Sequence, residues 1–157
     1  MFLKNVGDII KGKEISLVVE VLAPADVYRD YVPSYVFGVI KNTTKERVGR
    51  ISLRIGSNEL INRYAGNIGY TIDKKHRGSG FAEKACRLLV ALAIEHGFEH
   101  LYITCNPDNG PSRRTIEKLG STLLGVENVP TKTEMYERGE RIKLRFRWAL
   151  KGIPHPD

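Results

Sequence analysis

One strand–helix–strand unit constrains the fold of this chain more than any other sequence feature. Residues 66–72 have the character of a strand weakened by two glycines. An apolar stripe at three- and four-residue steps then predicts a helix that begins near Phe81 and ends at His96-Gly97. Residues 101–105 follow as a short buried strand. Because such a connection makes a right-handed crossover, the two strands are expected to be parallel neighbours.

The rest of the chain favours antiparallel pairing. Residues 22–34 hold two prolines and are predicted to form at most a short helix, while residues 56–65 and 130–141 are predicted to be exposed polar loops. The fold class is therefore α/β with a mostly antiparallel sheet, and 157 residues fit one domain over 1–157. The other predicted elements are strands at 15–21, 35–40, 47–55, 123–129 and 142–150, and a helix at 112–119.

The charge balance predicts an anionic partner. There are 25 Lys and Arg residues against 18 Asp and Glu residues, a net charge of +7, which suits a nucleic acid, an acidic protein or a polyphosphate cofactor. The first eight residues lack a leader pattern, and the longest apolar run is far shorter than the ~20 residues that cross a bilayer, so a cytoplasmic location is expected. Cys86 and Cys105 lack the neighbours that a zinc site needs, so no metal is expected.

The segment that opens the long helix is suited to an anion. Gly78 and Gly80 let the backbone fold tightly and present N–H groups at the positive end of the helix dipole. A Walker A loop is excluded because Lys84 does not follow a correctly spaced glycine, and a dinucleotide fingerprint is excluded by Glu83. Turn glycines without a ligand are the alternative. Nearby basic or potentially basic residues favour a phosphate: Lys74, Lys75, His76, Arg77, Lys84 and Arg87.

Three motifs follow one another from residue 69 to residue 120. Arg77-Gly78-Ser79-Gly80-Phe81-Ala82 fits the pattern Arg/Gln-x-x-Gly-x-Gly/Ala. Asn109-Gly110-Pro111-Ser112, followed by Glu117-Lys118-Leu119-Gly120, fits Asn-x-x-Ala/Ser with a Glu-Lys-x-Gly helix end, and Gly69-Tyr70 precedes both. In these motifs the chain resembles the GNAT superfamily of N-acetyltransferases, in particular the subgroup that acetylates protein N-terminal amines and small amines.

The resemblance implies a GNAT-like mixed, mostly antiparallel sheet of about seven strands, splayed in the middle, with helices on both faces. Acetyl-CoA would lie in the gap between residues 66–72 and 101–105, and a bulge near the strand end would aim a backbone N–H at the oxyanion. The implied cofactor contacts are backbone groups of Tyr70, Thr71 and Ile72 for the pantetheine arm, N–H groups of Arg77, Gly78, Ser79, Gly80, Phe81 and Ala82 for the pyrophosphate, and Asn109 and Ser112.

The catalytic positions depart from the family pattern. Many members place a tyrosine acid where this chain has Ile116, so Ser112 is the candidate for contact with the departing thiolate, with helix capping as its alternative role. Asn67 stands where the subgroup often has Glu and would orient a water or a substrate group. A base could be a water chain or one of four loop residues that are otherwise solvated: Glu59, Tyr64, Glu134 and Tyr136.

The predicted function is transfer of an acetyl group from acetyl-CoA to a primary amine, on a protein N-terminus or a small molecule, by direct attack in a ternary complex. One alternative is a CoA-binding sensor without turnover, suggested by Ile116 and Asn67. Another is nucleic-acid binding through Lys143, Arg145 and Arg147, which alternate with apolar residues but lack a stacking platform and are otherwise a solvated strand face. No membrane partner is expected, and a homodimer stays open because dimers are frequent in the family.

Overall fold

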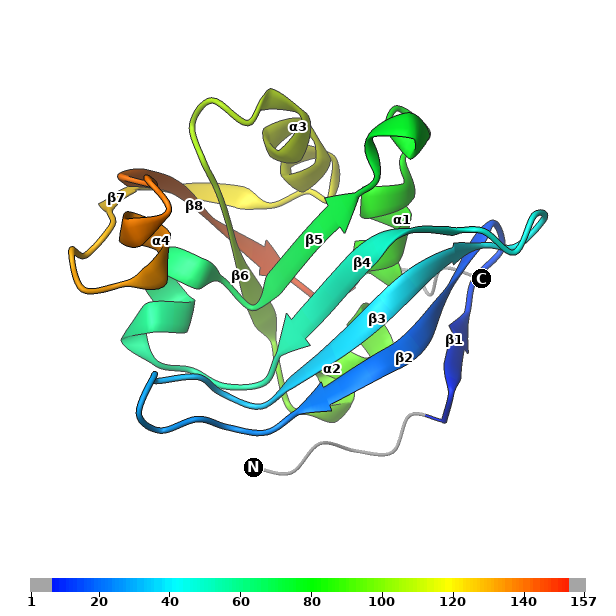
Figure 1. Cartoon of the computed structure of the whole chain (residues 1–157), viewed down its shortest axis with the longest axis horizontal. Coiled ribbons are helices and arrows are strands. Elements are labelled where there is room, and N and C mark those ends of the chain that lie inside the picture. Colours follow the sequence, from blue (N-terminus) through cyan, green and yellow to red (C-terminus); the bar gives the residue numbers. More distant parts are fainter. Residues whose placement is uncertain (1–6, 153–157) are drawn as a thin grey trace.

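The computed structural model describes residues 7–152, and its strands form two sheets that diverge in the middle of the molecule (Figure 1). The larger sheet has the antiparallel order β1-β2-β3-β4-β5, and the smaller one has the antiparallel order β6-β8-β7. The predicted fold class is confirmed, with a short additional strand at the N-terminal side. The expectation that the strands before and after the long helix pair as parallel neighbours is wrong, because β5 and β6 belong to different sheets that diverge at this point. The strands are β1 (Ile9–Lys11), β2 (Ile15–Ala23), β3 (Ser34–Lys41), β4 (Arg47–Arg54), β5 (Ile68–Ile72), β6 (His100–Cys105), β7 (Thr122–Asn128) and β8 (Ile142–Ala149).

The predicted long helix is present as two consecutive segments. These are α1 (Phe81–Leu88) and α2 (Val90–Glu95). Between them the Leu89 N–H donates to the Cys86 carbonyl at 3.1 Å, a bond that spans three residues and makes a tighter turn than an α-helix. Gly97 follows with φ of +88°, the left-handed conformation predicted from its sequence position. The other helical segments are η1 (Leu60–Ala65), η2 (Lys74–His76), α3 (Gly110–Lys118) and α4 (Glu134–Glu137).

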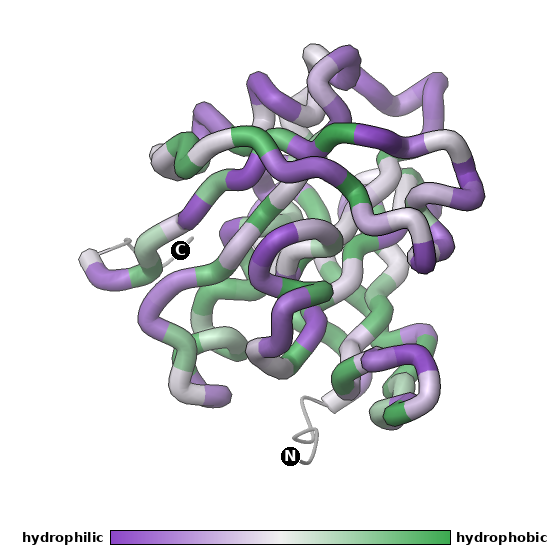
Figure 2. Tube along the Cα trace, turned by 90° about the vertical axis from the view of Figure 1, so that its left-hand side faces the viewer, coloured by the Kyte–Doolittle hydropathy of each residue, from purple (hydrophilic) through white to green (hydrophobic). Residues whose placement is uncertain are grey.

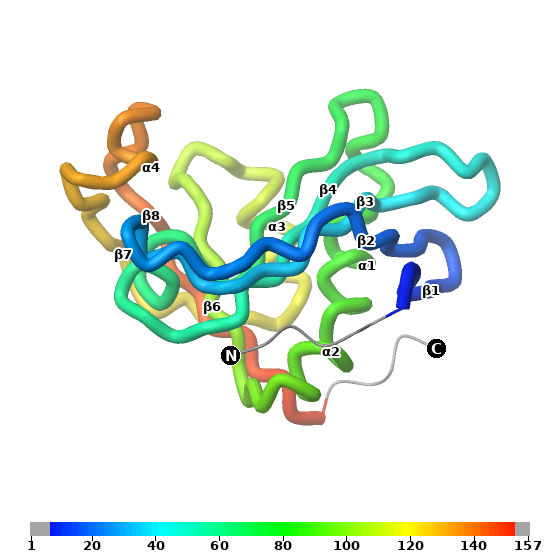
Figure 3. The backbone as a smooth tube through the Cα atoms, turned by 60° about the horizontal axis from the view of Figure 1, so that its bottom comes forward, coloured from blue at the N-terminus to red at the C-terminus, as the bar shows by residue number. Residues whose placement is uncertain are grey.

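Helices α1 and α2 cover one face of the larger sheet, behind the strands in Figure 1 and below them in Figure 3. Phe37 and Ile51 of the sheet and Leu89 of the helical layer belong to one buried cluster, which Phe146 and Trp148 of the smaller sheet also join. Apolar segments run through the middle of the molecule and hydrophilic ones lie at its periphery (Figure 2). Burial on this side leaves the opposite face of the larger sheet free to line a cleft.

The segment between β2 and β3 forms a turn instead of the predicted short helix. The backbone N–H of Asp26 donates to the Tyr31 carbonyl, and the Tyr31 N–H donates to the Asp26 carbonyl, both at 2.9 Å. The Asp26 carboxylate also accepts the Tyr28 N–H at 3.1 Å, a local bond that competes with helix formation. Tyr28 and Tyr31 are therefore carried on an exposed turn over the sheet edge.

Two segments predicted to be exposed loops contain helical turns. In the first, the Asn58 side chain accepts the Ile61 N–H at 2.9 Å, and Ile61 is buried, so η1 packs onto the smaller sheet. In the second, the Thr133 hydroxyl accepts the Tyr136 N–H at 3.2 Å and caps α4. Each turn is too short to show helical periodicity in the sequence, so only its side-chain cap and tertiary contacts define it.

The part of the chain that the structure describes contains no helix long and apolar enough to span a membrane. The prediction that a leader is absent concerns the first eight residues, most of which lie outside the described residues.

Candidate active site

A cleft of about 980 Å³ opens at the point where the two sheets separate. Its walls come from the cleft face of β4, the edge of β5, the end of β6 and the start of α3, and the 28–31 turn and the 130–143 segment cover it. The cleft brings together four residues that the sequence predicts for the cofactor site: Tyr70, Thr71, Asn109 and Ser112. Residues without a predicted role also line it: Arg50, Ser52 and Arg54 of β4, and Lys132, Arg138 and Glu140 of the covering segment.

Asn67 holds the two sheets together at the closed end of the split. It is 1% exposed, its backbone N–H donates to the Tyr102 carbonyl at 2.7 Å, and its side-chain oxygen accepts the Tyr102 N–H at 2.9 Å. Its carbonyl accepts the Arg54 N–H, and its Nδ2 donates to the carbonyls of Arg54 and Gly56 at 3.1 and 3.2 Å. These bonds engage both polar ends of the amide, so we assign Asn67 a structural role in place of the predicted catalytic one.

Alternate residues of β5 present their backbone groups to the split. Thr71 faces Arg50 of β4, and the N–H of Asp73 donates to the Val48 carbonyl, so odd-numbered residues pair with β4. The backbone N–H and carbonyl groups of Tyr70 and the other even-numbered residues therefore point toward the smaller sheet. Thr71 thus cannot pair through its backbone with a cofactor as predicted, and the Ile72 carbonyl already accepts Arg77 Nε at 2.8 Å.

The predicted bulge near the end of β5, where the oxyanion would form, is not observed. The pairing of β4 with β5 runs in unbroken register from Gly49↔Ile72 to Leu53↔Ile68. The change of direction occurs instead at Asn67, whose N–H points to β6 while its carbonyl points to β4. This local turn of the backbone separates the sheets without inserting an extra residue.

Ser112 and Tyr70 form a hydroxyl pair beside the split. Tyr70 Oη lies 2.9 Å from Ser112 Oγ, and it also donates to the Ser112 carbonyl at 3.3 Å. Asn109 caps α3 by accepting the Ser112 N–H at 3.2 Å, which leaves the Ser112 hydroxyl free to face Tyr70. Burial raises the pKa of Tyr70 to about 12, so its phenol stays protonated at neutral pH and remains a hydrogen-bond donor.

The raised pKa of Tyr70 predicts a loss of stability at alkaline pH. An unfolded tyrosine releases its proton near pH 10, whereas folded Tyr70 holds it until about pH 12, so the free energy of unfolding falls as pH rises between these values. The largest slope from this group is about 1.4 kcal/mol per pH unit. Urea unfolding at pH 9, 10 and 11 should show a steeper fall for the unmodified protein than for Tyr70→Phe. Parallel pH dependences would contradict the prediction.

The glycine loop has the conformation that an anion cradle requires. Gly78 and Gly80 have φ of +93° and +74°, and Gly80 is the N-cap of α1 without any side-chain cap bond. A Cβ on Gly78 would meet nothing within 4 Å, and one on Gly80 would meet only Lys84 Nζ at 3.8 Å, so the space in front of the helix is open. Lys84 contacts the Ser79 carbonyl and Glu14, which holds a positive charge beside the loop. The donors fit a pyrophosphate.

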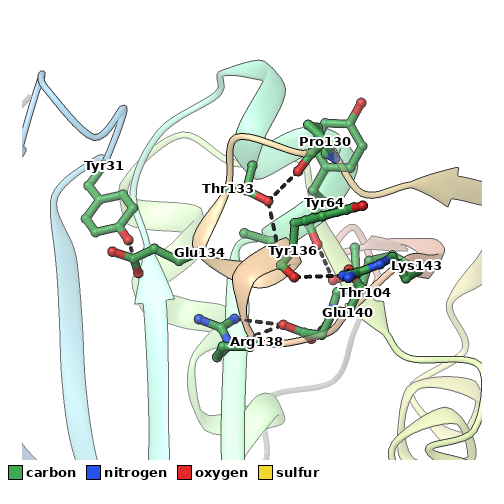
Figure 4. Close-up of polar contacts among 12 residues, drawn as sticks. Tyr31, Tyr64, Thr104, Pro130, Thr133, Glu134, Tyr136, Arg138, Glu140 and Lys143 are labelled. Carbon is green, nitrogen blue, oxygen red and sulfur yellow. Dashed lines mark hydrogen bonds and ion pairs between the residues drawn. The ribbon is translucent and has the colours of Figure 1, made fainter.

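Two of the four candidate bases, both in the covering segment, have side-chain partners. Glu134 accepts a hydrogen bond from Tyr31 Oη at 2.6 Å (Figure 4). Tyr136 lies under the Arg141 guanidinium, 3.6 Å from its ring centre. Glu59 and Tyr64 line the cleft, and the Tyr64 carbonyl accepts the Thr104 hydroxyl at 2.8 Å. None of these four side chains is bonded to Ser112 or Tyr70 among the described residues. Ile116 is fully buried.

The last strand does not display the basic face that the sequence predicts. Lys143 is 8% exposed and contacts Glu140 at 2.5 Å, because β8 lies between β6 and β7 beneath the covering segment. Burial alone would raise the pKa of Glu140, but the hydrogen bond from Lys143 and the nearby positive charges hold that pKa below its ordinary value. Arg145 stacks over Tyr102 and donates to the Asn62 carbonyl, so only Arg147 of the three is exposed.

Comparison with known families decides the identity of the fold. The model of the acetyltransferase (GNAT) domain matches residues 19–122, about two thirds of the chain. The chain belongs to the GNAT acetyltransferase family. It is therefore an acyltransferase, which accounts for an anion cradle and a split sheet in one molecule. The comparison with curated proteins gave no match.

Three solved structures of other proteins share this fold. Ribosomal-protein-S5-alanine acetyltransferase from Vibrio fischeri superposes with a TM-score of 0.59 at 15% identity; the match covers 77% of this chain and 64% of that one. RimJ from Mycobacterium smegmatis, in complex with CoA-disulfide, gives 0.58 at 18%, over 77% and 55%. RimL, a ribosomal L7/L12 alpha-N-protein acetyltransferase, gives 0.63 at 15%, over 90% and 98%. At these identities the likeness is one of fold.

Proposed function

We propose that this GNAT protein transfers an acetyl group from acetyl-CoA to a primary amine on a protein N-terminus or a small molecule. The observation that carries the proposal is the placement of two features along one split. An open glycine cradle lies past the carboxyl end of β5, and the Ser112–Tyr70 hydroxyl pair lies beside the strand itself. A pyrophosphate in the cradle would direct the attached thiol arm along β5 toward these hydroxyls and into the cleft.

The geometry supports fewer cofactor contacts than the sequence predicts. N–H groups of residues 78–82 would hold the pyrophosphate, and the even-numbered edge of β5 would pair with the pantetheine arm as an added strand does. Within that edge, Tyr70 offers both its N–H and its carbonyl, whereas Ile72 offers its N–H alone. Acetyl-CoA supplies the activated thioester carbonyl, and the chain supplies orientation.

The oxyanion donor follows from the same alternation. A cofactor that enters at the 74–80 loop and runs along β5 brings its thioester to the closed end of the split, near Asn67. The outward backbone donor closest to that end is the Ile68 N–H, and Ile68 lines the cleft. We assign the Ile68 N–H to the developing oxyanion, because a donor fixed in a strand needs no reorganisation during the reaction.

The proton steps use Ser112 and solvent. The neutral amine forms a bond to the thioester carbon, the carbon–sulfur bond breaks, and the Ser112 hydroxyl donates its proton to the departing thiolate. Tyr70, protonated and 2.9 Å away, returns a proton to Ser112 and regains one from solvent in the open cleft. The ammonium proton leaves through water in the open cleft, since none of the candidate carboxylates contacts the hydroxyl pair among the described residues.

Removal of the Ser112 hydroxyl tests this assignment. We expect Ser112→Ala to lower kcat by roughly 100-fold, the lower end of the usual contribution of a positioned acid, with little change in the Kd of acetyl-CoA. Tyr70→Phe should lower kcat less, because Ser112 can exchange protons with water. Thr122→Ala, which removes a hydroxyl on exposed β7, is the matched control. An unchanged kcat in Ser112→Ala would limit Ser112 to capping α3.

The second candidate function is a CoA-binding sensor, favoured by the buried Ile116 at the usual acid position. Release of free thiol from acetyl-CoA over a panel of peptides, small amines and aminoglycosides separates the two. Turnover stimulated by any acceptor supports the transferase. Tight acetyl-CoA binding without turnover over the whole panel supports the sensor.

A further inference from the structure

Two arginines lie on the floor of the cleft. Arg50, Ser52 and Arg54 alternate along β4, so their side chains share the face opposite the α1–α2 layer, and all three line the cleft that also contains Ser112. Ser52 pairs with Gly69 of the neighbouring strand β5. An acceptor that reaches Ser112 through this cleft therefore passes over guanidinium groups.

Arg54 is built into this floor. Its Nη1 donates to the carbonyls of Ala65 and Gly66 at 3.3 and 3.0 Å, which fixes the guanidinium over β5. A Cβ on Gly69 would lie 3.0 Å from Arg54 Nη2, so the glycine provides the room that the guanidinium occupies. Burial lowers the pKa of Arg54, and the charges of Arg138 and Arg50 act in the same direction. In residues 7–152, Arg54 has no carboxylate within ion-pair distance.

The two acidic residues of the covering segment that line the cleft, Glu134 and Glu140, have other partners. Glu134 bonds Tyr31 at 2.6 Å and lies 3.9 Å from Arg29, and Glu140 pairs with Arg138 and Lys143 (Figure 4). The remaining carboxylates of the lining, on Asp30 and Glu59, belong to exposed residues of the outer loops. The lining holds six basic side chains, Arg29, Arg50, Arg54, Lys132, Arg138 and Lys143, against four acidic ones.

We propose that the cleft selects amine acceptors that carry a carboxylate next to the reactive amine, with Arg50 and Arg54 as the specificity residues. The inference rests on the proposed acetyltransferase function and names the acceptor class for it. A guanidinium recognises a carboxylate through two parallel hydrogen bonds, and its attraction is strongest where water is partly excluded, as over Arg54. The same charges repel polyamines and aminoglycosides, which excludes them as preferred acceptors.

Thiol release with matched acceptors tests the proposal. One arm uses peptides with the same N-terminal residue and either Asp-Glu, Asn-Gln or Lys-Lys at positions two and three. A second arm compares free alanine with alaninamide, which lacks the carboxylate next to the amine. We expect kcat/KM for the acidic acceptor to exceed that for its amide by roughly tenfold or more in at least one arm. The arm that responds identifies the source of the carboxylate, an acidic N-terminus or a free amino acid.

Variants assign the preference to the two arginines. Arg50→Gln and Arg54→Gln should bring the ratio of acidic to amide kcat/KM close to one, and Arg50→Glu should favour the Lys-Lys peptide. Arg147→Gln, on the exposed side of β8, is the control and should leave the ratio unchanged. If Arg54→Gln fails to fold, Arg50→Gln and Arg50→Glu test the preference for acidic acceptors. Arg50 is exposed, so these variants should keep the fold.

The outcomes separate the inference from the function on which it rests. Turnover with equal kcat/KM for acidic, amide and basic acceptors overturns the inference alone. An acidic preference that survives in both Arg50 variants overturns the assignment to these arginines. Failure of every acceptor to stimulate thiol release, with acetyl-CoA bound, overturns the proposed function and the inference together.

Discussion

Replacement of Gly80 by aspartate should weaken acetyl-CoA binding at least ~100-fold. The new carboxylate would lie among the N–H groups at the start of α1 that we assign to the pyrophosphate, and it would repel the same phosphates. Two like charges about 4 Å apart at a protein surface repel by about 4 kcal/mol, and each 1.4 kcal/mol changes an affinity tenfold. Isothermal titration calorimetry measures this loss directly.

Gly97→Asp is the matched control for this experiment. Gly97 also has a positive φ, +88°, and a Cβ there meets nothing within 4 Å, so the backbone strain matches that at Gly80. It lies after α2, away from the glycine loop. We expect Gly97→Asp to bind acetyl-CoA like the unmodified protein. No acetyl-CoA binding by the unmodified protein would reject the cofactor assignment altogether.

Asn67→Ala should lower the free energy of unfolding by about 4 kcal/mol. The substitution leaves the Tyr102 N–H and the carbonyls of Arg54 and Gly56 without the partners that the Asn67 side chain supplies. Each buried polar group left unpaired costs about 1–3 kcal/mol. Urea denaturation followed by circular dichroism measures the change, and Asn128→Ala on exposed β7 should shift the midpoint little.

The same variant separates the two roles considered for Asn67. If its role is structural, the loss of stability is large and kcat, measured where the variant is folded, changes modestly. If Asn67 orients a water or a substrate group, kcat falls steeply while the unfolding midpoint stays close to that of the unmodified protein. The second result would restore the role predicted from sequence.

Much of the fold is predictable because it is local or periodic. The strand–helix–strand unit, the hairpin of β3 and β4 and the end of α2 at Gly97 follow from hydrophobic spacing and from the conformational freedom of glycine. The glycine loop is also local, since its φ values and the uncapped start of α1 depend on a few adjacent residues. The motifs at 77–82 and 109–120 therefore indicate the family from the sequence alone.

The candidate site was harder to predict because its residues act through distant partners. The alternation of Arg50 and Arg54 in a predicted strand was the available signal, but nothing in the sequence shows that their shared face borders a cleft. Lys143 follows the spacing of a solvated face, yet it is buried because the 130–141 segment folds over β8. The hydrogen bond that Tyr31 donates likewise depends on the carboxylate of Glu134, which is 103 residues away in the sequence.

By itself, the sequence determined the class of fold, the family and the place of the anion cradle, because each depends on residues adjacent in the chain. Only the tertiary structure decided that Asn67 joins the two sheets and that Thr71 pairs with β4. It also decided that Ser112 lies beside Tyr70 and that guanidinium groups line the floor of the cleft. These depend on sheet register and on segments brought together across the split. Periodicity shows which face a residue takes, and only the packed chain shows what that face meets.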